Sequence, residues 1–258
     1  MMFCTRKETL LVAGVLTVPG SIDRRNLIRE TWASPANVDS IADGRAVVIF
    51  ILNRPPARLL TTILEEADHY KDILITDLDE NYEDLIYKVV ALMHWKMTNC
   101  SMPPYLMKID DDVVVDMDRV LFFLGESSKG NTNDAGIGGV VKGNGRDSIV
   151  NKELRIGECS LHCSLWKILT VQRNMAMKWS VTRELFPNEQ YPTYCSGPMY
   201  IYGSEALRKV YSALPQVDHF NVEDVAITGI GANIAQVYRR DWEKLMFGTD
   251  WTNPVGFS

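Results

Sequence analysis

Three consecutive carboxylates, Asp110, Asp111 and Asp112, interrupt an apolar run of strand length. Tyr105 to Ile109 precedes them and Val113 to Val115 follows. The acids are therefore expected at the exit of a β-strand, and in an open α/β sheet ligands bind outside the carboxyl ends of the strands. Hard carboxylate oxygens in this arrangement suit Mg²⁺ or Mn²⁺ carrying a phosphate-bearing substrate. The alternative is a solvated acidic turn, because a short acidic triplet is a weak signal by itself.

A second pair of acids, Glu223 and Asp224, stands before a short apolar segment that begins at Val225. Apolar residues after an acid predict a helix, and Asp is a natural N-cap for one. A carboxylate presented at a helix start beside a substrate groove can equally act as a general base. The sequence is compatible with both roles, helix N-cap and general base.

Three arginines, Arg24, Arg25 and Arg29, lie on a helix predicted from Ser21 to about Trp32. The helix follows the first predicted strand, Leu10 to Val18. The first strand-to-helix junction of an α/β fold is where nucleotides dock, and Arg offers bidentate contacts to phosphate. Ordinary solvated charges are the alternative interpretation.

Strand and helix patterns alternate four times in the first 125 residues, which predicts an α/β fold with a largely parallel sheet and right-handed crossovers. The predicted strands after the first are Ala46–Leu52, Asp72–Thr76 and the run that begins at Tyr105, and the predicted helices after the first end near Tyr70 and Met97.

After Leu124 the pattern changes, and residues 125–145 are predicted to be loops around a short strand at Ile137–Val141. The aromatic segment from Trp179 to Tyr202 is interleaved with Gly and Pro, which predicts rigid loops; its rings suit core packing or contact with sugar rings. A helix is predicted to begin at Ser204.

The chain of 258 residues is 46% hydrophobic and 23% charged, which fits one large domain or two closely joined ones. Its net charge of -6 argues against general nucleic-acid binding. The run Leu10 to Val18 is far shorter than the roughly 20 residues that cross a bilayer. We therefore expect a soluble chain, or the catalytic part of a protein whose anchor lies outside it.

The chain has five cysteines, so at least one thiol stays outside any disulfides. Asn99-Cys100-Ser101 is a glycosylation sequon, which matters only if the chain enters the secretory pathway.

Five motifs in order, spread over residues 8–235, resemble those of the β1,3-galactosyltransferases and their relatives that transfer N-acetylglucosamine. The residues that carry the resemblance are Arg24-Arg25 with Ile28-Arg29 and Thr31-Trp32, Asp72-Ile73-Leu74 with the helix from Tyr82 to Cys100, Lys108 to Val113, Trp179 with Tyr191 to Tyr200, and Glu223-Asp224-Val225 with Gly229.

The resemblance implies a glycosyltransferase-A fold: a Rossmann-like, mostly parallel sheet flanked by helices, with a C-terminal acceptor-side region. It implies two halves of one catalytic domain, residues 1–125 binding a nucleotide sugar and residues 126–258 holding the acceptor and the base. It also implies a UDP-sugar donor, Mn²⁺ or Mg²⁺, and inverting transfer of galactose in β1,3 linkage to a glycan on a glycoprotein or glycolipid. N-acetylglucosamine is the alternative sugar.

Residue by residue, the resemblance implies that Asp110, Asp111 and Asp112 form the acidic donor-binding motif, with Asp112 and then Asp110 as metal ligands. Asp224 matches the catalytic base, with Glu223 as second choice or orienting neighbour. Arg25 and Arg29 fall in the donor-side motif. The physical chemistry agrees, because a metal neutralises the charge that develops on the departing diphosphate, and inversion needs one base on the opposite face.

The resemblance also implies a Golgi membrane protein with a lumenal catalytic domain, although this chain lacks the family's N-terminal anchor. No histidine follows His219, so a histidine metal ligand from the C-terminal part is not expected. A disulfide between Cys100 and Cys195 is a guess at this stage. Two other classes compete: a phosphatase that uses Asp110 and Asp112, and a non-catalytic relative that binds a nucleotide sugar or glycan.

Overall fold

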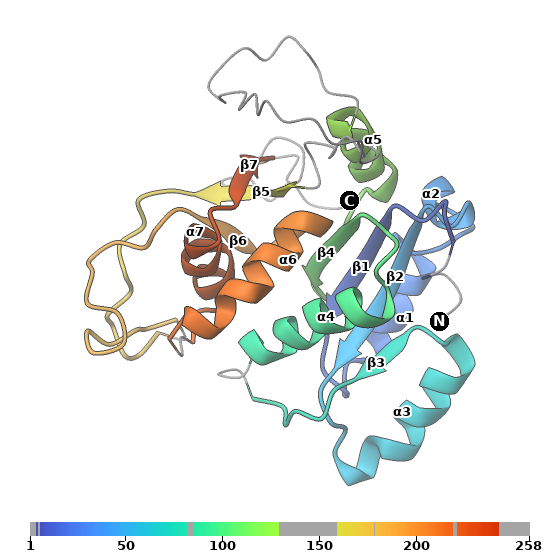
Figure 1. The fold of residues 1–258 in the computed structure, drawn as a ribbon. Helices are drawn as coiled ribbons and strands as arrows, with labels where there is room; N and C mark the ends of the chain where they lie inside the picture. Colours follow the sequence, from blue (N-terminus) through green and yellow to red (C-terminus); the bar gives the residue numbers. More distant parts are fainter. Residues whose placement is uncertain are drawn as a thin grey trace, which may run out of the picture.

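The computed structural model describes residue 4 and residues 6–81, 85–128, 159–177, 179–218 and 221–242. Within these residues, seven strands form one sheet in the order β3-β2-β1-β4-β6-β5-β7 (Figure 1). The strands are β1 (Leu11–Leu16), β2 (Ala46–Leu52), β3 (Ile73–Ile75), β4 (Tyr105–Asp110), β5 (Ser160–Trp166), β6 (Tyr194–Gly203) and β7 (Tyr238–Asp241).

The first four strands are parallel, and β6 turns the sheet antiparallel. β1 pairs with β2 on one side and with β4 on the other, so that Leu16 lies opposite both Ile51 and Asp110. β6 pairs antiparallel with β4 and with β5, and β7 runs parallel to β5. The residues that follow β1 and β4 therefore emerge at the same edge of the sheet, which we call the carboxyl edge.

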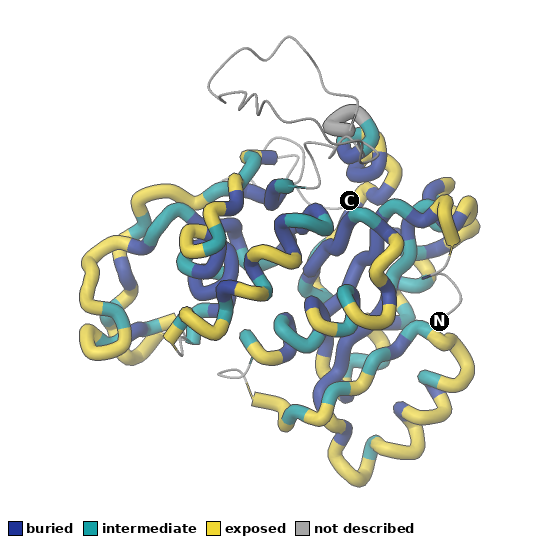
Figure 2. The backbone as a smooth tube through the Cα atoms, in the orientation of Figure 1, coloured by how far each residue is buried: buried dark blue, intermediate teal, exposed yellow. Residues whose placement is uncertain are grey.

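Helices cover both faces of the sheet, which explains the continuous apolar strands. The helices are α1 (Ile22–Glu30), α2 (Asp39–Ala42), α3 (Ala57–Tyr70), α4 (Leu85–Asn99), α5 (Met117–Ser128), α6 (Ser204–Ala213), the 3₁₀ turn η3 (Leu214–Gln216), the π-helical segment η4 (Val225–Gly231) and α7 (Ala232–Ile234). One buried cluster joins α4 and α6 to the sheet, and a second joins α1, α3 and α5 to it. The central strands are largely buried, and the outer sides of the helices are exposed (Figure 2). Among the described residues, no helix is both long and apolar enough to span a bilayer.

The predicted α/β class with a mostly parallel N-terminal sheet is confirmed. β2 has the predicted bounds, and α6 begins at Ser204 as predicted. The prediction of loops throughout the aromatic segment is wrong for Tyr194–Gly203, which forms the longest strand among the described residues. The strand predicted at Ile137–Val141 lies outside the described residues.

Two disulfides correct the guessed pairing of Cys100 with Cys195. Cys4 bonds to Cys100, with their Cα atoms 4.7 Å apart, and Cys163 bonds to Cys195, with their Cα atoms 5.5 Å apart. Cys4 and Cys100 stand ahead of the parallel neighbours β1 and β4, so both lie toward the amino ends of these strands. Cys163 and Cys195 lie on the antiparallel neighbours β5 and β6. Both disulfide pairings depend on the order of the strands in the sheet, which the local sequence does not encode.

Candidate active site

The carboxyl edge brings Asp111 to the end of β1. Thr17 follows β1 directly, and its hydroxyl donates to Asp111 Oδ2 at 2.7 Å. Arg24, from α1, donates to Asp111 Oδ1 at 2.6 Å. Both carboxylate oxygens of Asp111 thus have protein donors, and the parallel register of β1 and β4 explains why they meet.

Asp112 differs from its two neighbours because its side chain is exposed. Among the described residues it makes no hydrogen bond or ion pair. Asp110 is half-buried at the end of β4, where burial raises the pKa of its carboxyl. Asp110 Oδ1 accepts a bond from Lys108, which leaves Oδ2 without a hydrogen bond in the described part of the chain.

Within the described residues, no three His, Cys, Asp or Glu side chains converge as a closed metal cage. A divalent cation that is bound together with substrate phosphates needs only one or two carboxylates. The exposed carboxylate of Asp112 and the open oxygen of Asp110 fit that donor set.

Lys108 lies beneath the acids and connects them to the C-terminal part of the chain. Its side chain is 1% exposed. Its Nζ donates to Asp110 Oδ1 at 2.7 Å and to the carbonyl of Gly197 at 2.6 Å, and it lies 3.7 Å from Glu223 Oε2. Burial opposes the charge of this ammonium group, but the carboxylates of Glu223 and Asp110 raise its pKa above the ordinary value. One buried cation thus joins β4, β6 and the segment before η4.

Glu223 and Asp224 lie in different environments although they are adjacent in sequence. Glu223 is buried, accepts a hydrogen bond from the hydroxyl of Tyr200, and has a pKa raised by burial to about 7. Asp224 is partly exposed and accepts a hydrogen bond from the amide of Val225 at 2.8 Å, so its role as helix cap is real. Burial also raises the pKa of Asp224, to about 6. Of the two, Asp224 is the carboxylate that a second substrate can reach.

Asp224 lies against β6 at Gly197. A Cβ placed on Gly197 would lie 2.9 Å from Asp224 Oδ2, closer than real Cβ atoms come to other atoms. The η4 segment is also fastened to β6 through Thr228, whose Oγ1 accepts from the amide of Cys195 at 2.9 Å and donates to the carbonyl of Asp224 at 2.6 Å. The absence of a side chain at Gly197 therefore determines where the carboxylate of Asp224 can lie.

The arrangement agrees with a comparison to known protein families. The family model described as Galactosyltransferase matches residues 23–243. The chain belongs to the galactosyltransferase family. The match includes the acidic triplet, Lys108 and the Glu223-Asp224 pair.

Curated relatives of this galactosyltransferase-family chain are distant. It is 26% identical to lactosylceramide 1,3-N-acetyl-beta-D-glucosaminyltransferase B of Danio rerio over 92% of its own length and 57% of the relative's. It is 28% identical to beta-1,3-galactosyltransferase bre-2 of Caenorhabditis elegans, over 80% and 52% of the two chains. It is 26% identical to beta-1,3-galactosyltransferase 1 of Homo sapiens, over 87% and 60%. The chain thus spans between half and three fifths of the length of these relatives.

Among solved structures, the bifunctional glycosyltransferase WbbM matches over 90% of this chain and 38% of its own. The sequence identity is 8% and the TM-score is 0.42.

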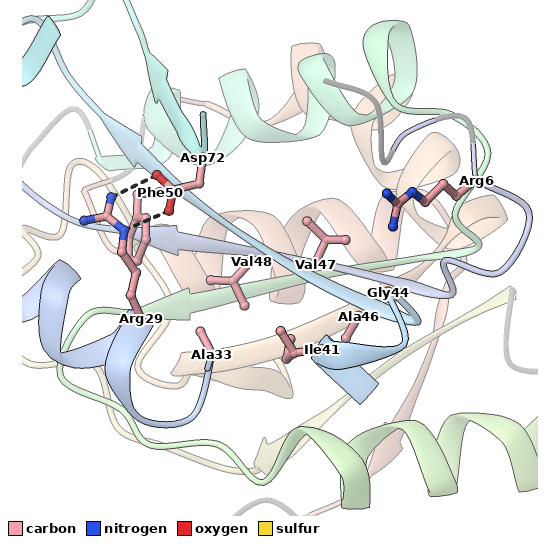
Figure 3. Close-up of a pocket in the computed structure, with 10 residues that line it drawn as sticks. All are labelled: Arg6, Arg29, Ala33, Ile41, Gly44, Ala46, Val47, Val48, Phe50 and Asp72. Atoms are coloured by element: carbon pink, nitrogen blue, oxygen red, sulfur yellow. Dashed lines mark hydrogen bonds and ion pairs between the residues drawn. The ribbon is translucent and has the colours of Figure 1, made fainter. Parts of the chain in front are cut away.

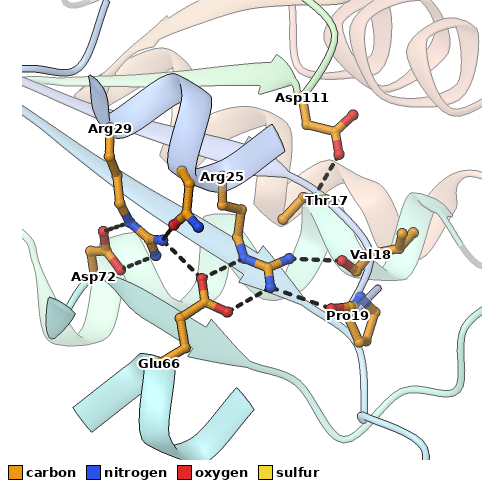
Figure 4. A network of polar contacts seen from close by, with 9 residues as sticks. Thr17, Val18, Pro19, Arg25, Arg29, Glu66, Asp72 and Asp111 are labelled. Atoms are coloured by element: carbon orange, nitrogen blue, oxygen red, sulfur yellow. Dashed lines mark hydrogen bonds and ion pairs between the residues drawn. The ribbon is translucent and has the colours of Figure 1, made fainter. Parts of the chain in front are cut away.

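Arg25 and Arg29 are the two arginines of the predicted donor-side motif of this galactosyltransferase-family chain. Both lie in an internal network of hydrogen bonds and ion pairs (Figure 4). Arg25 is fully buried; it forms a bidentate pair with Glu66 and donates to the carbonyls of Val18 and Pro19. Arg29 forms a bidentate pair with Asp72 and also donates to Glu66. The structure does not bring either guanidinium to the acidic triplet, whereas Arg24 reaches it. Arg25 instead holds the turn that follows Thr17.

The network around Glu66 is expected to be important for stability. Replacing Glu66 by Gln should destabilise the folded chain by about 3 to 5 kcal/mol, because it leaves the buried Arg25 without its counter-charge. Burial opposes the ionised form of Glu66, but Arg25 and Arg29 lower its pKa. The stabilisation is therefore present above the unfolded pKa near 4 and is lost as the pH falls. Urea unfolding at pH 7 and pH 3 measures both effects.

Asp68→Asn is the matched control for Glu66→Gln, because Asp68 lies on the same helix in an exposed pair with Lys71. It should leave the unfolding midpoint unchanged. Equal midpoints for Glu66→Gln and Asp68→Asn would contradict a structural role of the network.

Gly197 provides a test of the geometry around Asp224. Gly197→Ala should reduce turnover by about a hundredfold, since moving a catalytic group by about 1 Å can cost that much. Gly125→Ala is the control, because a Cβ at Gly125 meets nothing within 4 Å. Steady-state kinetics of both variants measure the effect, and a turnover in Gly197→Ala equal to that of Gly125→Ala would show that this contact does not position the carboxylate.

Three site residues lie in the recognised motifs but were given no role of their own from the sequence: Lys108, Tyr200 and Gly197. A lysine inside a strand buried on both faces is a usable signal, because Lys is almost never fully buried unless it is paired. Tyr200 and Gly197 gave no such signal, because both stand in a segment rich in aromatic residues and Gly.

A surface cavity of about 230 Å³ lies beside β2 (Figure 3). It is lined by Ala46 to Val48 and Phe50 of β2, with Arg29 and Asp72 at one end and Arg6 at the other. None of the candidate carboxylates of the site lines it. The carboxyl edge, where the charged groups meet, remains the candidate site.

Proposed function

We propose that this chain transfers galactose from UDP-galactose in β1,3 linkage to a glycan acceptor, with inversion at the anomeric carbon. The observation that carries the proposal is the position of Lys108, which joins Asp110 of the acidic triplet to Glu223 beside Asp224. The names of the relatives support both galactose and N-acetylglucosamine as the donor sugar. A β1,3-N-acetylglucosaminyltransferase is therefore the alternative.

On the donor side, Asp112 and Asp110 would hold Mn²⁺ or Mg²⁺ together with the diphosphate of the UDP-sugar. The metal would supply a Lewis acid that neutralises charge on the departing UDP. Asp111, held by Thr17 and Arg24, keeps the end of β1 beside the end of β4. We assign Arg25 and Arg29 to the donor side as supporting residues: Arg25 holds the turn at Val18 and Pro19, and Arg29 shares Glu66 with Arg25.

On the acceptor side, Asp224 would remove the proton from the attacking hydroxyl. The acceptor oxygen forms a bond to the anomeric carbon as the bond from that carbon to the phosphate oxygen breaks, and UDP leaves on the opposite face. Near neutral pH a carboxyl with a pKa of about 6 is mostly ionised, yet it is a stronger base than an ordinary Asp. Glu223, bound by Tyr200 and facing Lys108, positions Asp224.

The two parts of the chain would then have different roles in the reaction. Residues 1–125 hold the nucleotide sugar, and residues 126–258 supply the base and the acceptor contacts. The acceptor would be a glycan on a glycoprotein or glycolipid. Two disulfides support an oxidising compartment such as the Golgi lumen.

UDP release by the purified chain tests the proposal. We expect release from UDP-galactose or UDP-N-acetylglucosamine in the presence of sugar acceptors and Mn²⁺, and loss of release in EDTA. Asp112→Ala should reduce release by roughly a hundredfold or more. The preferred donor then identifies the sugar.

A non-catalytic relative would bind UDP in the presence of Mn²⁺ without releasing it from any donor. Calorimetric titration should detect UDP binding both in such a relative and in an active enzyme that lacks its acceptor. Slow hydrolysis of the UDP-sugar by water, lost in Asp112→Ala, is expected only of the enzyme and separates the two. The absence of UDP binding would refute the transferase proposal.

A further inference from the structure

The sequon Asn99-Cys100-Ser101 is the only Asn-x-Ser/Thr sequence in the chain, and the proposed reaction makes no use of it. Asn99 ends α4, and both Asn99 and Ser101 are exposed. Between them, Cys100 is fully buried and bonded to Cys4. Disulfides of this kind are typical of the oxidising compartments of the secretory pathway, in which such sequons are modified.

From these observations we infer that Asn99 carries an N-linked oligosaccharide, added before the Cys4–Cys100 disulfide closes. The inference is independent of the proposed function. The amide nitrogen of Asn99 forms a bond to C1 of the first sugar while the bond from C1 to a polyprenyl diphosphate breaks. One amide proton is lost to a base, and the polyprenyl diphosphate leaves.

The order of events follows from how the folded segment is held. Lys96 Nζ donates to the carbonyl of Pro103 at 2.8 Å, and the amide of Ser204 donates to the carbonyl of Pro104 at 2.8 Å. With Cys100 bonded to Cys4, the segment after α4 is therefore fixed on both sides of Ser101. Asn99 belongs to the last turn of α4, and Cys100 is buried in its disulfide, so the folded chain does not present the three sequon residues as a free segment. The oligosaccharide is added to the unfolded segment, and later oxidation of the two thiols by a protein disulfide fixes it.

A glycan at Asn99 is compatible with the proposed chemistry because of where it lies. Asn99 precedes the amino end of β4, while Asp110 forms the carboxyl end of the same strand. The strand separates its two ends by about 16 Å at the usual rise per residue. An oligosaccharide at Asn99 therefore projects from the side of the sheet opposite to the carboxyl edge.

The test is the mass of the full chain secreted from animal cells behind a signal peptide. We expect treatment with peptide N-glycosidase to lower the mass and to convert Asn99 to Asp, as seen by peptide mapping in H₂¹⁸O. Asn99→Gln and Ser101→Ala should both be secreted with the lower mass. An unmodified Asn99 in the secreted wild-type chain would overturn the inference.

Two further variants test the proposed order. Cys4→Ser removes the competing disulfide and should raise the fraction of chains modified at Asn99. Cys4→Ala removes the same thiol by another substitution and serves if Cys4→Ser is not secreted. An occupancy in secreted Cys4→Ser lower than that of the wild type would overturn the order of events.

Discussion

Asp224→Asn should reduce sugar transfer by a factor of about 10² to 10⁴, the usual contribution of a general base. Asn keeps an oxygen that can accept the hydrogen bond from the Val225 amide, and it has the shape that fits beside Gly197. The fold is therefore preserved while the proton acceptor is lost. Steady-state transfer assays with the donor that the UDP-release test selects measure the effect.

The pH dependence of kcat/KM provides a second test of the role of Asp224. Burial raises the pKa of its carboxyl to about 6, so the kcat/KM of the wild-type chain should rise as the pH increases through about 6, as the carboxylate becomes ionised. An ordinary Asp would give this limb near pH 4. In Asp224→Asn the limb near 6 should disappear.

Glu223→Gln is the companion variant that separates the two adjacent acids. Gln can still accept the hydrogen bond from Tyr200, so we expect a smaller loss than in Asp224→Asn, because Glu223 does not take the proton itself. A loss in Glu223→Gln larger than in Asp224→Asn would reverse the assignment of the base.

Lys108→Met should destabilise the folded chain by about 3 to 5 kcal/mol and abolish transfer. Its removal leaves the buried Glu223 and the half-buried Asp110 without the cation that faces both, and breaking a buried ion pair costs this much. The thioether chain of Met fills much of the space but provides no charge. Urea unfolding at pH 7 measures the change in the free energy of unfolding.

Two further variants control for Lys108→Met. Lys167→Met removes a lysine whose side chain is 61% exposed and lies 3.8 Å from Asp241, and it should leave the stability unchanged. Adding Glu223→Gln to Lys108→Met should recover part of the lost stability, because the uncompensated buried charge is then gone. If the double variant is no more stable than Lys108→Met alone, the 3.7 Å contact does not carry the coupling.

The elements of the N-terminal half could be read from the sequence because each is encoded by a local pattern. The apolar run at Ala46–Leu52 predicts a strand covered on both faces, and β2 has these bounds. The break from Ile109 into Asp110 predicts a strand exit, and β4 ends there. Strand β6 was not predicted because Gly197 and Pro198 argue for a loop, yet the strand forms where Tyr200 and Tyr202 are fully buried between β4 and β5.

By itself, the sequence determined the α/β class, the family motifs and the candidate carboxylates Asp110 to Asp112, Glu223 and Asp224. Only the tertiary structure decided which groups meet. Lys108 bonds to the carbonyl of Gly197, 89 residues along the chain, and Thr17 bonds to Asp111, 94 residues along the chain. Such contacts, like the two disulfides, depend on the order and direction of strands in the sheet. Helical and strand periodicities report only on residues a few positions apart, so they cannot encode that order.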